Sequence, residues 1–299
     1  MSERTSYYGR PIIKEPVWTP EIPLYFFFGG LAGASAALAE AARWSGNDVL
    51  ARRAKIASAV GAAVSPVLLI EDLGRPAKFY NMLRVFKVRS PMSIGTWILS
   101  AFGSATGVSV ATEVAGLLPR VRRLSEASAG LLGLPMSTYT GALVAESVVP
   151  VWHEGRHELP FAFAGGAAAA AGGAAAILTP AYASRPARRL GILGAALELG
   201  ASQIMDARTE DLVAEATKKG TAGRYKRLAQ AATIGGAAVT ALAGRRRFGA
   251  ALGGGLLVAG SVCERFAVYH AGKISAADPR YTSIPQRQRA DRSGQPAIS

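Results

Sequence analysis

The feature that most constrains this chain is the arrangement of its apolar residues, which form eight long blocks separated by short charged segments. The blocks run over residues 22–42, 56–70, 92–118, 127–151, 159–178, 190–205, 228–243 and 248–263. A soluble amphipathic helix carries polar side chains on one face throughout its length, whereas these blocks hold few charges. About 20 apolar residues cross a bilayer, and Lys or Arg at the ends of the shorter blocks have stems long enough to reach the membrane surface. The sequence therefore predicts an all-α integral membrane protein with eight transmembrane helices.

The charged residues exclude several other classes of protein. Lys and Arg outnumber Asp and Glu by 34 to 20, but they gather at the block ends, where lipid headgroups lie, rather than on a nucleic-acid-binding face. The single cysteine, Cys263, excludes an intrachain disulfide and an iron–sulfur cluster held by this chain's cysteines alone. No histidine lies within a block, so we expect no haem. The polar segment 1–21 lacks the apolar core of a signal peptide.

The distribution of Lys and Arg between the two sides predicts the orientation. Four short connections (43–55, 119–126, 179–189 and 244–247) hold 13 Lys and Arg in 36 residues. The opposite side holds 21 in 108 residues, which is a larger number at a lower density. Short, densely basic loops are typical of the cytoplasmic side. We therefore expect both termini to lie outside the cytoplasm, in the cell membrane.

The segment His153-Glu-Gly-Arg-His157 matches the H-E-x-x-H pattern of zinc hydrolases. Gly155 and Pro160 disfavour a continuous helix that would align the two histidines. A catalytic zinc also needs a third protein ligand, and His270 is the only other histidine. We therefore expect no metal site here.

The most informative connection is 71–97. Gly74 can end the second long helix, Pro76 can begin a short one on the membrane surface, and Ser90 can cap the next long helix. Asp72 and Arg75 could pair across the turn. The basic residues of this connection form a candidate docking face for a partner: Arg75, Lys78, Arg84 and Lys87.

Acidic residues at or near membrane depth are candidates for proton transfer, because a carboxylate in hydrocarbon is costly unless it is neutral or paired. The candidates are Glu71 at the membrane boundary, Glu146 near the end of the fourth block, and Glu198 in the middle of the sixth. Glu146 lies two helical turns after Tyr139, so we expect the two to share a face. A structural role, as a neutral or hydrogen-bonded carboxyl, is an equal alternative for Glu198.

The motifs Asp72-Leu-Gly-Arg-Pro76, 81–87 (Asn-Met-Leu-Arg-Val-Phe-Lys) and 90–97 (Ser-Pro-Met-Ser-Ile-Gly-Thr-Trp) closely resemble the signature of the NrfD/PsrC family. The opening Tyr25-Phe-Phe-Phe-Gly-Gly-Leu-Ala-Gly33 and Tyr139-Thr-Gly141 are similar to that family as well. Its members are the membrane subunits of polysulfide reductase, nitrite reductase and some formate dehydrogenases. The resemblance covers about residues 7–180.

This resemblance implies eight spans in two four-helix bundles and a membrane anchor that exchanges electrons between the quinone pool and a docked iron–sulfur subunit. It implies an exchangeable quinone, menaquinone or ubiquinone, near Tyr139, with no haem or iron–sulfur cluster in this chain. Tyr25 stands where the family often carries a histidine. Asp72 lies next to Glu71 at the membrane boundary. The implied partners are a ferredoxin-like iron–sulfur subunit and a catalytic subunit, often molybdopterin-dependent.

The resemblance divides the chain into a polar segment 1–21, a first transmembrane half 22–178 with the quinone-site motifs, a second half 179–270 and a polar basic tail 271–299. Two alternatives remain. The chain could be a passive anchor that binds its partner but no quinone, or a small-solute transporter, although no internal repeat supports the latter.

Overall fold

A computed structural model describes residues 13–285, and every regular element in that range is a helix. Eight helices are long: α1 (Glu21–Trp44), α2 (Asp48–Leu73), α4 (Pro91–Ala115), α5 (Pro119–Ala145), α7 (Leu159–Leu178), α8 (Arg185–Arg208), α10 (Gly220–Ala243) and α11 (Arg247–Ala277). Three are short: α3 (Pro76–Leu83), α6 (Pro150–Glu154) and α9 (Asp211–Lys218). The long helices match the eight apolar blocks in order.

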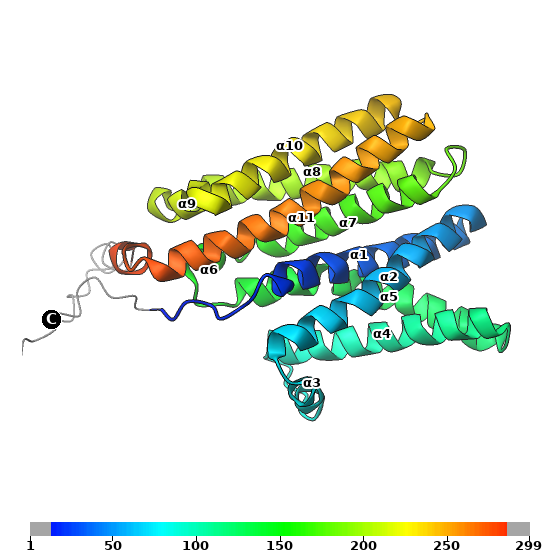
Figure 1. Cartoon of the computed structure of the whole chain (residues 1–299), viewed down its shortest axis with the longest axis horizontal. Coiled ribbons are helices and arrows are strands. Elements are labelled where there is room, and N and C mark those ends of the chain that lie inside the picture. The colour runs from blue at the N-terminus through cyan, green and yellow to red at the C-terminus, as the bar shows by residue number, and fades with distance from the viewer. Residues whose placement is uncertain (1–12, 286–299) are drawn as a thin grey trace, which may run out of the picture.

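The long helices lie roughly parallel or antiparallel in two neighbouring groups (Figure 1). In one group α1 packs against α2 and α5, and α4 packs against α5; in the other α7 packs against α8 and α11, and α10 against α11. Contacts of α7 with α1 and α5 join the groups. We call the end with α3, α6 and α9 the near end, and the end with the α1–α2, α4–α5, α7–α8 and α10–α11 connections the far end.

The connection between α2 and α4 has the local structure that the sequence predicted. Gly74 ends α2 with φ +69°, a left-handed conformation that costs glycine little. Pro76 begins α3. The Ser90 side chain accepts from the backbone N–H of Ser93 and caps α4, with Pro91 at its first position.

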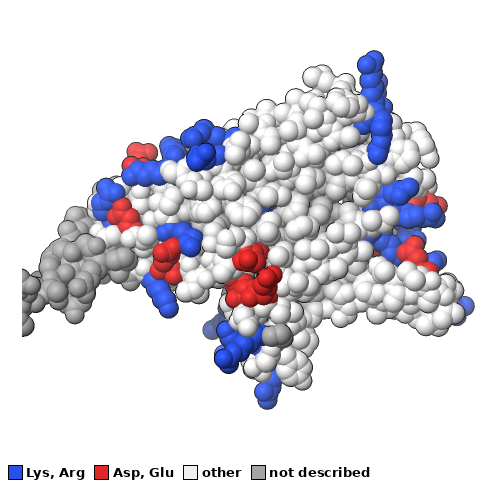
Figure 2. All heavy atoms as spheres, in the orientation of Figure 1, with Lys and Arg blue, Asp and Glu red and all other residues white. Residues whose placement is uncertain are grey.

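Five of the described helices are long and apolar enough to cross a membrane: α1, α2, α4, α7 and α11. In α5, α8 and α10 arginines and lysines occupy the first turns, which lowers the mean hydropathy of those helices. The charged side chains visible in Figure 2 gather towards the two helix ends and around α3, and the band between them carries almost none. This distribution fits a protein whose middle lies in hydrocarbon.

Several block boundaries differ from the helix ends. α2, α5 and α10 begin at Asp48, Pro119 and Gly220, well before their apolar blocks, because the charged residues that precede those blocks are also helical. The last block was predicted to end at Cys263, but α11 continues to Ala277, so the predicted tail 271–299 begins inside a helix. The fourth block was predicted to reach residue 151, but α5 ends at Ala145 and α6 starts at Pro150. In the last block the charged residues after Cys263 marked a false end, and in the fourth the apolar residues around Pro150 hid a real one.

Candidate functional site

A pocket with an empty volume of about 530 Å³ lies at the near end of the first group. Its walls come from the segment before α1 and from five helices: Trp18; Ile22, Tyr25 and Phe26 of α1; Leu69, Asp72 and Leu73 of α2; Met82 of α3; Met92, Gly95 and Thr96 of α4; Tyr139 and Leu143 of α5. All three residues predicted to bind quinone therefore line one pocket.

The polar centre of the pocket is a pair of tyrosines. Tyr25 and Tyr139 are 3% and 8% exposed, and their hydroxyl groups are hydrogen-bonded to each other. Two hydroxyl groups need only one of their two protons for this bond, so the other proton can be donated to an acceptor in the pocket. Gly95 makes space for the Tyr139 ring, since a Cβ at that position would lie 2.5 Å from a ring carbon.

The segment before α1 closes one side of the pocket. Thr19 donates to Oδ1 of Asp72 from its backbone N–H at 3.0 Å and from its hydroxyl at 2.6 Å. Asp72 thus bonds Thr19, where the sequence suggested Arg75. Trp18 stacks on Trp152 with ring centroids 5.1 Å apart. These contacts hold the segment across the pocket and fix the Asp72 carboxylate beside it.

The predicted docking residues surround the same pocket from outside. Arg75, Lys78, Arg84 and Lys87 are all exposed, on α3 and its flanks. Lys78 Nζ donates to the carbonyl of Leu73 at 2.7 Å, which ties α3 to the end of α2. Glu71 is also exposed, one residue before Asp72. The near end therefore presents basic and acidic side chains next to the pocket mouth.

The comparison with protein families agrees with this geometry. The model described as "Polysulphide reductase, NrfD" matches residues 12–194, more than half of the chain. The chain belongs to the NrfD family. This family comprises membrane subunits of oxidoreductase complexes, whose members partner with iron–sulfur and catalytic subunits. A comparison with curated proteins finds no significant match. The family match includes every helix that lines the pocket.

Two of the predicted proton-transfer residues of this NrfD-family chain lie away from the pocket. Glu146 is exposed at the end of α5, because the helix stops at Ala145. It therefore does not share the buried wall that carries Tyr139. Glu198 is buried in a second cavity, among α8, α10 and α11.

That second cavity contains residues that the sequence reasoning placed elsewhere. Glu264 and Arg265 follow directly after the predicted end of the last block at residue 263, but they lie in the middle of α11 and are 7% and 1% exposed. The apolar spacing of Ala267, Val268 and Ala271 after them continues the helical pattern and could have revealed this.

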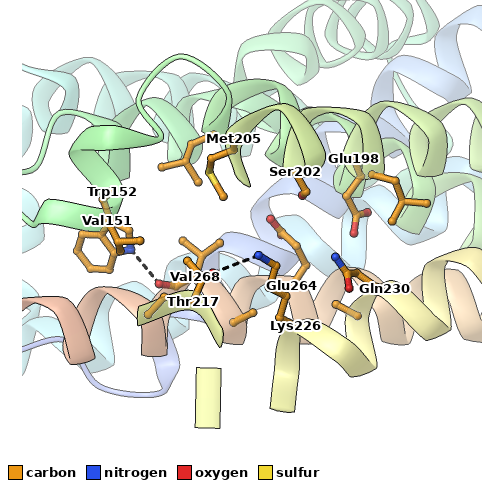
Figure 3. A pocket seen from close by; sticks show the side chains of 15 residues that line it. Val151, Trp152, Glu198, Ser202, Met205, Thr217, Lys226, Gln230, Glu264 and Val268 are labelled. Carbon is orange, nitrogen blue, oxygen red and sulfur yellow. Dashed lines mark hydrogen bonds between the residues drawn. The ribbon is translucent and has the colours of Figure 1, made fainter. Parts of the chain in front are cut away.

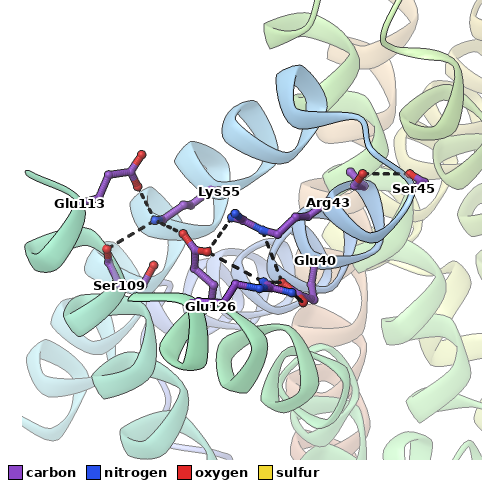
Figure 4. Close-up of polar contacts among 9 residues, drawn as sticks. Glu40, Arg43, Ser45, Lys55, Ser109, Glu113 and Glu126 are labelled. Atoms are coloured by element: carbon purple, nitrogen blue, oxygen red, sulfur yellow. Dashed lines mark hydrogen bonds and ion pairs between the residues drawn. The ribbon is translucent and has the colours of Figure 1, made fainter. Parts of the chain in front are cut away.

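The far end of the first group holds a network of ion pairs (Figure 4). Its contacts are Glu40 with Arg123 at 2.5 and 2.7 Å, Arg43 with Glu126 at 2.7 Å, Lys55 with Glu126 at 2.8 Å, and Lys55 with Glu113. Three bases and three acids from α1, α2, α4 and α5 therefore balance one another. The network is on the opposite side of the membrane region from the pocket and joins the four helices there.

The H-E-x-x-H segment lies at the end of a short helix. α6 ends at Glu154, so His153 and His157 are not on one continuous helix. Among residues 13–285, no cluster of three or more His, Cys, Asp or Glu side chains is arranged to hold a metal ion.

Proposed function

We propose that this NrfD-family chain is the quinone-exchanging membrane subunit of an iron–sulfur oxidoreductase complex. The observation that carries the proposal is the hydroxyl pair of Tyr25 and Tyr139 inside a mostly apolar pocket at the near end, with Asp72 in its wall. Buried tyrosine hydroxyls in an apolar wall are suited to a ligand that is mostly apolar and has a few acceptor atoms.

The residues of the pocket fit a quinone headgroup. A quinone is an apolar ring with two carbonyl acceptors, and it takes up two electrons and two protons when it is reduced. Ile22, Phe26 and Leu69 offer apolar contact, and Met82 and Met92 add side chains that adapt to irregular shapes. The hydroxyl proton left over from the tyrosine pair is a donor for a carbonyl.

Carboxyl groups beside the pocket support proton exchange at the same end. Asp72 lines the pocket, and the neighbouring Glu71 is exposed at the near-end surface. This pair offers protons a short route between water and the pocket wall. Glu146 and Glu198 lie elsewhere, so the route that we propose does not include them.

The partner is a ferredoxin-like iron–sulfur subunit that docks on α3 and its flanks and connects this chain to a catalytic subunit. The four predicted docking residues and Arg89 are exposed there, together with Tyr80, Phe86 and Val88, which are 70%, 61% and 69% exposed. Exposed apolar side chains among basic ones are typical of a surface that a partner covers. A cluster docked there would lie next to the pocket, which suits electron exchange.

We also propose that α5, α8 and α10 cross the membrane, which gives eight spans in two four-helix bundles with both termini outside the cytoplasm. Large apolar side chains in the middle of these three helices point outward: Leu131 and Leu134 of α5, Leu193 and Leu197 of α8, and Ile234 of α10 are 44–70% exposed. Lipid would cover such residues.

The test is to purify the complex in mild detergent, extract it with solvent and measure quinone per mole of this chain. We expect bound quinone in the wild-type complex and little in a Gly95→Ala variant, whose methyl group would lie against the Tyr139 ring. Gly103→Ala is the matched control, because a Cβ at Gly103 meets no atom within 4 Å. A wild-type complex without quinone would support a passive anchor, and equal quinone in both variants would place the site outside this pocket.

A further inference from the structure

The second cavity lies between the helices of the second group and, with the open space at its mouth, has a volume of about 610 Å³ (Figure 3). Its near-end part is mostly apolar and is lined by Val151, Trp152, Met205 and Val268. Its inner end carries the carboxyl groups of Glu198 and Glu264. A cavity that changes from apolar to acidic at membrane depth needs a physical explanation.

The charges at the inner end do not balance. Arg265 is 1% exposed and forms an ion pair with Glu264, while its Nη2 donates to the Phe163 carbonyl at 2.8 Å. Its guanidinium carbon also lies 3.8 Å from the centre of the Phe163 ring. One guanidinium and two carboxylates leave one negative charge, and Glu198 is the carboxyl group outside the pair.

Glu198 is poorly compensated by its neighbours. It is 2% exposed and accepts one hydrogen bond, from Thr233 Oγ1 at 3.3 Å. Its Oε2 has no hydrogen-bond partner among the described residues. A Cβ placed on Gly166 would lie 3.1 Å from both this Oε2 and Nη2 of Arg265, so the two groups face each other across that glycine.

The other charged residues around the cavity are already neutralised. At the mouth, Lys226 of α10 bonds both oxygens of Asp206 of α8, at 2.5 and 2.7 Å, and the Thr217 hydroxyl at 3.2 Å. α7 contributes Phe163 and Gly166, neither of which titrates. An isolated negative charge at this depth would cost several kcal/mol unless a cation or a proton removed it.

We propose that the inner end of this cavity is a proton-binding site, in which Glu198 carries one proton beside the Glu264–Arg265 ion pair. The proton comes from water at the cavity mouth and binds one carboxylate oxygen, and its release returns it to water with no electron transferred. The bound proton makes the inner cluster neutral. This site is separate from the tyrosine pocket and does not depend on quinone binding there.

The packing of the second group favours access to this site from the near end. Beyond Glu198 the helices approach each other closely through glycines. A Cβ on Gly173 would lie 2.6 Å from the carbonyl oxygen of Gly254, and one on Gly236 would lie 3.0 Å from that of Gly253. These close contacts of α11 with α7 and α10 narrow the way towards the far end, which favours proton exchange through the cavity mouth on the near side.

Infrared spectroscopy of the full chain in lipid vesicles tests the proposal. We expect a C=O stretching band from a protonated carboxyl group that persists at a pH at which exposed carboxyl groups are ionised, and that shifts in D2O. Glu198→Gln should remove this band. Glu146→Gln, which changes an exposed carboxyl group, should leave it unchanged. Loss of the band from wild type, or its survival in Glu198→Gln, would refute the proposal.

Two further measurements complete the test. If Glu198→Gln does not accumulate, Glu198→Asp should keep a protonated band at a shifted frequency, and the absence of that band would count against the site.

The melting temperature is then compared in sodium chloride and in choline chloride. A stabilisation by sodium that occurs in wild type but not in the Glu198 variant would mean that a metal cation neutralises the cluster, which would overturn the proton assignment. Equal stability in the two salts is expected.

Discussion

At the scale of single residues, the role of a side chain depends on the residues that pack around it. Tyr139 is an ordinary buried tyrosine by sequence spacing, but the opposing Tyr25 hydroxyl and the missing side chain at Gly95 place its phenol in a pocket. A hydroxyl group that bonds a ligand carbonyl contributes through that bond, whereas its ring contributes through packing.

Replacement of Tyr139 by Phe should therefore leave assembly intact and slow quinone exchange. Loss of one hydrogen bond from a buried hydroxyl costs about 1–3 kcal/mol, which corresponds to roughly ten- to a hundred-fold in affinity or rate. Steady-state rates at subsaturating quinone measure the effect in the purified complex. Tyr182→Phe is the control, because Tyr182 is 81% exposed at the far end. Wild-type kinetics for Tyr139→Phe would remove this hydroxyl from the site.

At the scale of helices, the far-end network shows how charged helix ends are accommodated. The side chain of Glu126 is 8% exposed and contacts both Arg43 and Lys55, so it links α5 to α1 and α2. Its removal would take from Arg43 its short ion pair and leave Lys55 with Glu113 alone, in a partly buried place, which costs more than the loss of a surface pair.

Glu126→Gln should consequently lower stability by about 2–4 kcal/mol, measured as a fall in melting temperature in detergent. The comparison is Glu215→Gln, which breaks a solvent-exposed pair with Lys219 and should lower the melting temperature far less. Equal losses in the two variants would show that the network adds nothing beyond ordinary surface pairs.

The short helix α3 leads to a prediction about assembly. Lys78→Glu together with Arg84→Glu should weaken binding of the iron–sulfur partner by ~2 kcal/mol or more where those charges are desolvated. If the two charges instead stay exposed to solvent in the complex, salt screens them, and the loss of binding should be smaller at high salt. Pull-down at low protein concentration measures it, with Arg120→Glu and Arg245→Glu at the far end as the control pair. Unchanged assembly of the α3 variant would exclude α3 as the docking face.

At the scale of the whole molecule, the charges at the two ends predict its orientation. The far-end loops are short and densely basic, so we expect them in the cytoplasm and the near end outside. In a Cys263→Ala background, Ser299→Cys should react with a membrane-impermeant thiol reagent in intact cells, although Ser299 itself lies outside the described residues. Ser45→Cys at the far end should react only after lysis. The reverse pattern would invert the orientation.

The sequence by itself determined the membrane-helical class, because apolar blocks of near-bilayer length separated by charged turns have no other low-energy solution in lipid. It also predicted the α2–α4 connection, since Gly74, Pro76 and Ser90 act through local backbone geometry. The family motifs pointed to Tyr139, Tyr25 and Asp72, because each of these residues lies in a short segment that resembles the family signature.

Only the tertiary structure decided which distant residues meet. The hydroxyl groups of Tyr25 and Tyr139 are separated by 114 positions in the chain, and Thr19 and Asp72 by 53. The burial of Glu198, Glu264 and Arg265 in one cavity depends on how α8 and α11 pack. Local sequence fixes a helix and its ends through bonds within a few residues, whereas the partner of each helix face depends on packing between segments that no local pattern records.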